Sequence, residues 1–343
     1  MKKILVAEQL DSKKENYLDP DKNIYNPMPV FPFLTEEQIE QELEGFIDPE
    51  AFAAEVAALK EASKSQNCQI VDTSFIICLL KWEDAPEIMK MLTVMREWAF
   101  RNEGGGVGSN DYDDFDFNKE TEQLVILDPE YTDIKGAIIG GYRYIIHNKG
   151  TYEHGPMGDH FHFSENWKTE QWIELGRSFI NPYFQNKDKR YSIDYVLHGL
   201  GYIFAQYPDS KGYFGKVTLY NLYEQTKADE FFLAVANEYF APSKDCYVFP
   251  EDRVKEGVLT EDHKKLLDRD ILKGLFFILR GEYKLNMVRI MAVYNRMVDL
   301  RKMLYFGAFR HNEFGNTTEM GIAIKYEDIY PVIKEKFVEP YAG

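Results

Sequence analysis

This chain of 343 residues has few cysteines, no excess of basic residues and no long apolar runs. Cys68, Cys78 and Cys246 form no Cys-x-x-Cys pair, which argues against a disulfide framework or a cysteine zinc site and fits a reducing compartment. The net charge of −17 argues against sequence-independent nucleic-acid binding, which needs cations that neutralise phosphates.

The chain also has no window near the roughly 18 apolar residues that a membrane-spanning helix needs. Its first residues hold an apolar run of only four, "ILVA", whereas a signal peptide needs a longer one. We therefore expect a soluble, cytoplasmic protein, and contact with the surface of a membrane stays open.

Three familiar ligand motifs are incomplete. The segment "EGGGVGSN" at 103–110 lacks the Lys-Ser/Thr of a P-loop and the spacing of a dinucleotide fingerprint, so it is expected to be a connector. The acidic run at 111–118 lacks the glycine and the terminal glutamate of an EF-hand loop. His160 and His162 have a spacing that suits a metal on a strand, but a cupin would need an all-β chain, so no metal is expected.

Apolar periodicity predicts an α/β protein. Residues 1–34 are polar and rich in proline, and we expect an arm there. Helical spacing predicts helices at 35–46, 48–65, 85–103, 191–207, 227–240 and over much of 260–300. Apolar and β-branched runs predict strands at 73–84, 122–128, 136–147, 172–180, 213–221, 301–309 and 319–326.

The order of these elements predicts a mixed sheet, because three consecutive strands precede the crossover helix. We expect an N-terminal arm with helices over 1–66 and one main domain over 67–343. Within that domain, 260–343 would form a second lobe.

The strand at 172–180 holds two charged residues, Glu174 and Arg177, although charges are rarely buried without a partner. Residues three apart on a regular strand face opposite sides. A bulge at Gly176 would change that, and bulges are common beside active sites. A buried ion pair or an exposed edge is the alternative.

A cluster of basic residues follows this strand. Lys187, Lys189 and Arg190 precede a helix that we expect to begin near Tyr191. Cations and free backbone N–H groups at a helix start favour anions. This order suits a ligand with its reactive end beside the strand and a phosphate at the helix.

Several motifs together resemble the GNAT superfamily of acyl-transferring enzymes over roughly residues 70–330. The resemblance is strongest to the branch of acyl-homoserine-lactone synthases, lyso-ornithine-lipid N-acyltransferases and hemolysin-like acyltransferases. Its elements are the strand motif from Glu174 to Arg177, the Arg-x-x-x-Phe pair Arg96 and Phe100, the strand arginine Arg143, and an acidic loop with Asp111, Asp113, Asp114 and Asp116. The tail at 305–324 resembles the terminal hairpin of acyltransferases that form acyl-glycine or acyl-ornithine lipids.

The resemblance implies a mixed, mostly antiparallel central sheet with helices on both faces, and acyl transfer from a thioester to an amine. It nominates Glu174 as the base, directly or through a water. Arg143 and Arg177 would hold either the acceptor's carboxylate or the acidic loop. Backbone N–H groups where strand 172–180 splays from strand 213–221 would bind the thioester oxygen.

Two sets of binding residues follow from the resemblance. The predicted donor-binding residues are Phe179, Ile180, Lys187, Lys189, Arg190, Tyr191 and Gly215. The predicted substrate-binding residues are Arg96, Phe100, Asp113, Asp116, His160, His162, Phe163 and Tyr220. Phe161, Tyr202 and Phe204 are further candidates for an acyl-chain pocket.

The donor is expected to be an acyl-phosphopantetheine thioester and no cofactor is expected to stay bound. The compact pyrophosphate loop of acetyl-CoA-using relatives is absent, and "QNKDKRYSID" stands in its place. Within the branch this indicates an acyl-carrier protein as partner, with acyl-CoA left open. Lys187, Lys189, Arg190 and Lys211 would supply part of a basic docking face.

The expected acceptor is the amine of an amino acid such as glycine or ornithine, and no nucleic acid is expected as a partner. The alternatives are O-acyl transfer, autoinducer-type lactone synthesis, and a non-catalytic module that binds acyl-carrier protein or lipid.

Overall fold

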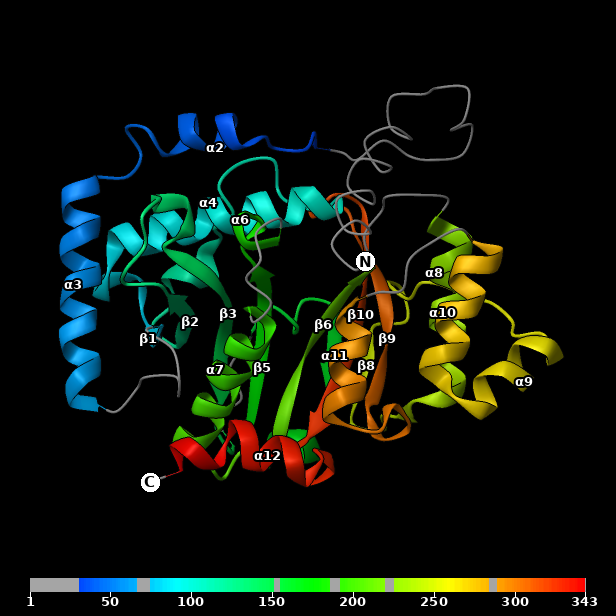
Figure 1. Cartoon of the computed structure of the whole chain (residues 1–343). Coiled ribbons are helices and arrows are strands. Elements are labelled where there is room, and N and C mark those ends of the chain that lie inside the picture. Colours follow the sequence, from blue (N-terminus) through cyan, green and yellow to red (C-terminus); the bar gives the residue numbers. More distant parts are fainter. Residues whose placement is uncertain are drawn as a thin grey trace.

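The computed structural model describes residues 31–66, 75–150, 155–185, 192–219, 225–283 and 289–342. In this part of the chain, eight strands form one mixed sheet (Figure 1). The spatial order is β1 (Ile76–Leu80), β2 (Thr121–Leu127), β3 (Ile138–His147), β5 (Trp172–Ile180), β6 (Gly212–Leu219), β10 (Thr317–Lys325), β9 (Leu304–His311) and β7 (Ala241–Pro242). Neighbours are antiparallel except β5 with β6 and β7 with β9. The predicted mixed, mostly antiparallel sheet is confirmed.

The longer helices lie where apolar periodicity predicts them. They are α2 (Glu36–Leu43), α3 (Pro49–Gln66), α4 (Pro86–Glu103), α7 (Ser192–Gln206), α8 (Gln225–Tyr239), α9 (Glu261–Arg269), α10 (Ile271–Glu282) and α11 (Arg289–Met297). Several short elements were not predicted from the sequence. They are α12 (Pro331–Phe337), α5 (Glu165–Lys168), α6 (Pro182–Gln185), and a separate ribbon of β4 (Phe161–Phe163) with β8 (Cys246–Val248).

Helices cover both faces of the sheet because its strands are apolar on both sides. On β2, Leu124 and Ile126 pack in one hydrophobic cluster with α7, whereas Val125 and Leu127 pack in another with α4. Successive strand residues point to opposite faces, so α4 and α7 lie on opposite sides. Figure 1 shows α7, α11 and α12 in front of the sheet.

Helix α4 has clear start and stop signals. Pro86 occupies its first turn, where a missing N–H costs nothing, and Gly104 ends it in the left-handed conformation with φ 91°. Arg96 and Phe100 are therefore held one turn apart on the buried face of a rigid element.

The helices of the N-terminal part belong to the same core as α4. Ile39 of α2 and Phe52 of α3 are fully buried in the cluster that contains Trp98 of α4. The boundary at 66/67 stays a prediction, as does the extent of the arm, because residues 1–30 lie outside the described residues.

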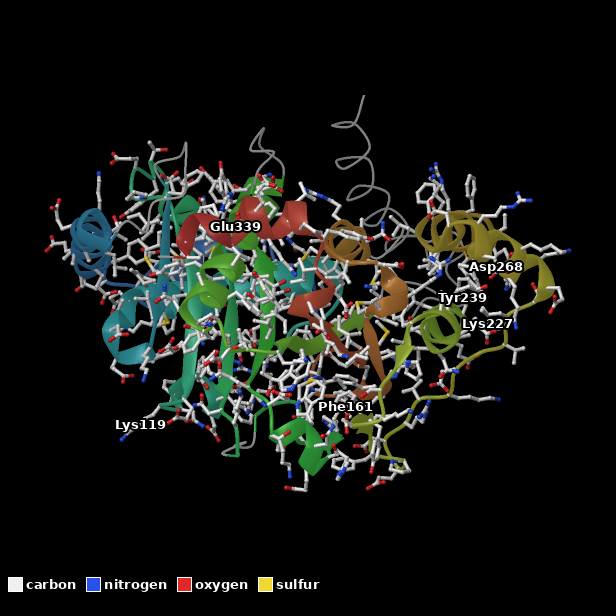
Figure 2. The ribbon with its side chains drawn as sticks, turned by 90° about the horizontal axis from the view of Figure 1, so that it is seen from below. Lys119, Phe161, Lys227, Tyr239, Asp268 and Glu339 are labelled. Carbon is white, nitrogen blue, oxygen red and sulfur yellow. The ribbon has the colours of Figure 1, made fainter. Side chains whose placement is uncertain are left out.

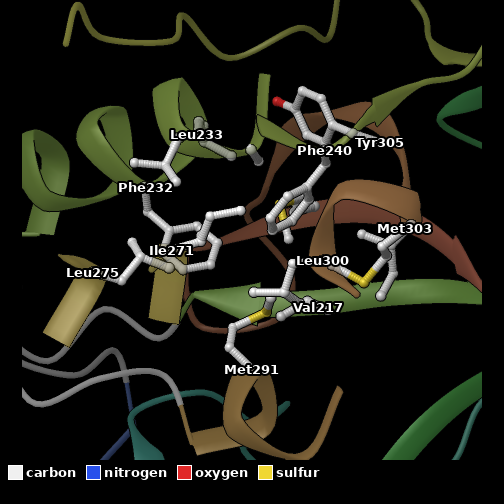
Figure 3. Packing of buried hydrophobic residues seen from close by; sticks show 14 of the residues in the cluster. Val217, Phe232, Leu233, Phe240, Ile271, Leu275, Met291, Leu300, Met303 and Tyr305 are labelled. Atoms are coloured by element: carbon white, nitrogen blue, oxygen red, sulfur yellow. The ribbon is translucent and has the colours of Figure 1, made fainter. Parts of the chain in front are cut away.

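A further hydrophobic cluster lies between the sheet and the helices α8, α10 and α11. Phe232 of α8, Leu275 of α10 and Met291 of α11 pack in one cluster with Val217 of β6 (Figure 3). Tyr239 donates its hydroxyl to Asp268 at 2.8 Å, which ties α8 to the end of α9 (Figure 2). The second lobe expected over 260–343 stays a prediction. In the described part of the chain, no helix is long and apolar enough to cross a membrane.

Candidate active site

The parallel strands β5 and β6 separate in the middle of the sheet. They pair only at Ile173–Tyr213, Glu174–Phe214 and Leu175–Gly215. Beyond Leu175, β5 continues alongside β3 to Ile180, and β6 continues alongside β10 to Leu219. Figure 1 shows the two strands diverging. The splay expected from the sequence is confirmed, and it leaves backbone groups along both inner edges without their sheet partner.

A bulge lies on β5 just where the strands part. Gly141 of β3 faces Phe179, but Arg143 faces Gly176, so β5 carries one more residue than β3 over this stretch. Arg177 has φ 52°, a left-handed conformation that few non-glycine residues adopt. The bulge predicted near Gly176 is confirmed. Strained backbone of this kind is concentrated at functional sites.

Arg177 and Arg143 both hold the acidic loop. Arg177 lies 3.1 Å from Asp113 and 3.4 Å from Asp111, and Arg143 lies 2.5 Å from Asp113. Burial of Asp113 opposes its ionisation, but the two guanidinium groups outweigh burial and lower its pKa. Of the two roles left open for these arginines, the structure favours holding the loop.

Arg96 lies behind this loop rather than at its surface. Its side chain is 1% exposed, and it pairs with Asp111 at 3.0 Å and with Asp116 at 2.9 Å. Burial disfavours the guanidinium charge, but these aspartates outweigh it and raise the pKa of Arg96. The same contacts lower the pKa of Asp116 despite its burial. Direct contact of Arg96 and Asp116 with substrate is therefore corrected to an internal role, which is to fix the acidic loop on α4.

Glu174 is buried beside the point of separation. Its Oε2 lies 2.8 Å from Nε2 of His147, and its Oε1 accepts the backbone N–H of Met157 at 2.9 Å. Gly155 packs on the carboxylate so closely that an added Cβ would lie 2.1 Å from Oε2. These contacts fix the carboxylate in one orientation at the wall of the cleft.

His147, the partner of this carboxylate, was not predicted from the sequence. It stands two residues beyond Ile145, which is paired with Glu174, so both side chains lie on one face of the sheet. Strand 136–147 was predicted, but its register against strand 172–180 was not, and only that register places the imidazole against the carboxylate.

A cavity of about 1120 Å³ opens through the splay. On the Glu174 face its lining is polar and includes Lys216, Thr218, His311 and Glu319. On the opposite face it is apolar, with Val196, Leu197 and Leu200 of α7 and Val293 and Met297 of α11. Because strand side chains alternate between faces, the gap between β5 and β6 joins a polar chamber to an apolar one.

Six predicted binding residues line this cavity, namely Phe100, Asp113, His160, Phe179, Ile180 and Gly215. Two others do not. His162 is exposed on β4 beside Tyr247, and Phe163 packs in a core with Trp167, so their predicted contact with substrate is corrected. Lys187, Lys189, Arg190, Tyr191 and Tyr220 lie outside the described residues.

The acyl-chain candidates of the sequence analysis are also mostly core. Phe161 packs in the same cluster as Phe163, and Tyr202 and Phe204 of α7 pack in or against the cluster that α7 forms with the sheet. The apolar chamber is instead lined by aliphatic side chains of α7 and α11 together with Tyr142, Tyr213 and Tyr294. His160 stacks on Phe309 at 3.7 Å and, among the described residues, no group of three or more His, Cys, Asp or Glu side chains is placed to hold a metal ion.

Comparisons with known proteins give this site a family. Residues 95–192 match the family of acetyltransferase (GNAT) domains. A glycine N(alpha)-acyltransferase of Bacteroides thetaiotaomicron is 30% identical over 268 residues, which cover 74% of this chain and 78% of that protein. A glycine N(alpha)-acyltransferase of Phocaeicola vulgatus is 30% identical over 284 residues, which cover 77% of this chain and 84% of that protein.

A solved structure of a probable N-acyltransferase from Enterococcus faecalis is more distant. The match covers 45% of this chain and 32% of the Enterococcus chain, with a TM-score of 0.27 and 10% sequence identity. This similarity is too slight to bear on the fold. The two relatives each match about three quarters of this chain over most of their own length. The chain therefore belongs to the same family of GNAT N-acyltransferases as the Bacteroides and Phocaeicola proteins.

Proposed function

We propose that the protein transfers a fatty acyl group from a phosphopantetheine thioester to the amine of an amino acid, with glycine as the preferred acceptor. The observation that carries this proposal is the position of Glu174, at the mouth of the gap that joins a polar chamber to an apolar one. The names of the two curated relatives support glycine.

The gap between β5 and β6 suits the thioester. Beyond the Leu175–Gly215 pair, the facing edges of the two strands no longer bond to each other. An extended pantetheine arm can take the place of the missing strand. Backbone N–H groups fixed there can also stabilise the negative charge that develops on the thioester oxygen.

The apolar chamber suits the acyl chain. Val196 and Leu200 of α7 and Val293 and Met297 of α11 line this chamber, which is part of the same cavity as the gap. Apolar surface of this kind binds a hydrocarbon chain by removing it from water, at about 0.8 kcal/mol for each buried methylene. A long chain therefore fits better than an acetyl group.

The polar chamber suits the amine. The amine nitrogen attacks the thioester carbon, a new C–N bond forms, and the C–S bond breaks to release the thiolate. The attacking nitrogen must lose a proton. The carboxylate of Glu174 lies beside the gap and accepts that proton as the base. His147 and the backbone N–H of Met157 hold that carboxylate in place.

The donor side of the proposal favours acyl-carrier protein over acyl-CoA. It rests on the basic segment with Lys187, Lys189 and Arg190, a part of the chain outside the described residues. Lys211 lies in the described part and is half-exposed, 3.8 Å from Glu327. A basic face there would complement an acidic carrier protein.

The test is a product screen with the purified chain. Acyl-carrier protein and acyl-CoA are each offered as donor against a panel of amino acids that includes glycine and ornithine, with S-adenosylmethionine as a separate acceptor. Mass spectrometry is expected to find N-acylglycine, formed faster from the carrier-bound donor. A lactone product, or no acyl-amide with any amine, would refute the proposal.

A further inference from the structure

Lys216 is a cation in the polar chamber that neither the proposed mechanism nor the family motifs use. It lies on β6, lines the cavity, and its side chain is 19% exposed. Its Nζ lies 3.9 Å from Oε2 of Glu319, which is beyond hydrogen-bond distance, and 5.3 Å from the ring centroid of Phe309. The ammonium group therefore retains hydrogen-bonding capacity that it can direct into the cavity.

The register of the sheet places Lys216 on the same face as Glu174. Phe214 pairs with Glu174 across the parallel strands, and Lys216 stands two residues further along β6. From strand spacings, the two Cα atoms are roughly 8 Å apart. Both side chains line the same cavity, so a small amino acid can lie between the ammonium group of Lys216 and the carboxylate of Glu174.

The other cations of the chamber are already neutralised. Arg143 and Arg177 both pair with Asp113, and Arg177 also reaches Asp111. An acceptor carboxylate would have to displace these contacts to bind either arginine. Among the described residues, Lys216 would give up a pair with Glu319 at 3.9 Å and a contact with the ring of Phe309 at 5.3 Å, both of them longer than the contacts of the two arginines.

Glu319 is arranged to aim Lys216 rather than to neutralise it fully. Its Oε1 accepts the hydroxyls of Thr218 at 3.0 Å and Thr317 at 3.3 Å. Burial opposes the charge of Glu319, but Lys216 and His311 outweigh burial and lower its pKa to about 2. The carboxylate is therefore anchored through one oxygen and faces Lys216 with the other.

We propose that Lys216 binds the carboxylate of the amino-acid acceptor and so sets the preference for amino acids over simple amines, with Glu319 as a positioning residue. This inference rests on the proposed function. With the carboxylate at Lys216, the amine of a small amino acid reaches the edge of the gap beside Glu174. The burial that lowers the pKa of Lys216 also strengthens its interaction with a carboxylate in the chamber.

The experiment compares glycine with glycinamide, which keeps the amine and replaces the carboxylate with a neutral amide. In the wild-type chain, kcat/KM is expected to be higher for glycine. Lys216→Met is expected to lower kcat/KM for glycine about 10- to 100-fold, mainly through KM, and to affect glycinamide much less. Lys216→Arg should restore part of the preference.

A matched control is Lys325→Met. Lys325 also stands on a strand with a glutamate, Glu327, at 3.9 Å, but it does not line the cavity. This variant should keep the wild-type preference. Unfolding in urea shows whether each variant is folded, and Glu319→Gln should weaken glycine binding in the same direction as Lys216→Met.

The outcomes separate this inference from the proposed function. A wild-type chain that acylates simple amines but no amino acid would refute the proposed function itself. A wild-type chain that prefers glycine, with that preference unchanged in folded Lys216→Met, would refute only the inference. Equal losses of kcat with glycine and glycinamide would overturn it in favour of a role at the thioester.

Discussion

Leu175 and Gly215 form the last pair between β5 and β6, and the cavity opens directly beyond them. A Cβ at position 215 would lie 2.3 Å from the carbonyl oxygen of Leu175. Glycine at this position therefore allows the two backbones to approach at the point where the strands must still touch. The position of the gap depends on that close approach.

Gly215→Ala should accordingly destabilise the fold and reduce activity. The clash is with backbone, so one strand must shift, at a cost of about 1–3 kcal/mol in the free energy of unfolding. Urea denaturation measures this. Gly176→Ala is the control, because a Cβ there meets nothing within 4 Å. Equal stability of both alanine variants would show that the approach at Gly215 is not required.

Arg96→Met should destabilise the chain strongly, because it leaves Asp111 and Asp116 buried without their nearest cation. Removal of one partner from a buried ion pair costs about 3–5 kcal/mol. Lys265→Met is the surface control, since Lys265 and its partner Asp262 are both exposed. Chemical denaturation should separate the two variants clearly. A stable Arg96→Met protein that has lost only amino-acid binding would instead support direct contact with substrate.

Asp229→Asn should become progressively more stable than the wild type as the pH rises. Burial raises the pKa of Asp229 from 3.8 to about 7, although the hydroxyl of Thr318 and the charge of Arg310 oppose this. Between these values the folded chain holds a proton that the unfolded chain has lost, so this group's contribution to wild-type stability falls with increasing pH.

The asparagine variant has no carboxyl group at this position, so its stability does not change with pH for this reason. Its free energy of unfolding should exceed that of the wild type only slightly at pH 4 and by on the order of 1–4 kcal/mol above pH 7. Unfolding in urea across this range provides the measurement. The exposed Asp262→Asn serves as a reference. A stability difference that does not change with pH would contradict the assignment.

Val293→Trp should shorten the acyl chain that the protein accepts. Val293 of α11 lines the apolar chamber opposite α7, so a larger side chain fills space that the chain end would occupy. With a series of acyl donors of increasing chain length, the variant's kcat/KM should be lower than that of the wild type for the longest donors and unchanged for the shortest. A uniform change for all donors would place the acyl chain elsewhere.

Most elements of the fold could be predicted from the sequence, since alternation and helical spacing are strong in long segments such as α4 and β3. β4 and β8 have three residues each, too few for a pattern to be detected. The bulge was predictable because Glu174 and Arg177 could not otherwise share a face. The pairing of His147 with Glu174 depends on strand register, which local pattern does not specify.

The site was predicted only in part for the same reason. The motifs identified Arg96 and Asp116, but their burial comes from the way the acidic loop folds onto α4. Lys216 belongs to no motif, and a single charged residue in a predicted strand is normally expected to face solvent. Only the pairing of β6 with β5 and β10 places it in the chamber.

The most direct test of the account is the rate of N-acylglycine formation by wild type and by Glu174→Gln, measured in single turnovers with saturating donor. Gln keeps the shape of the side chain but cannot take up the amine proton. The account predicts a rate lower by about 10²- to 10⁴-fold with unchanged stability in urea. A folded Glu174→Gln protein that forms N-acylglycine at the wild-type rate would contradict the central claim.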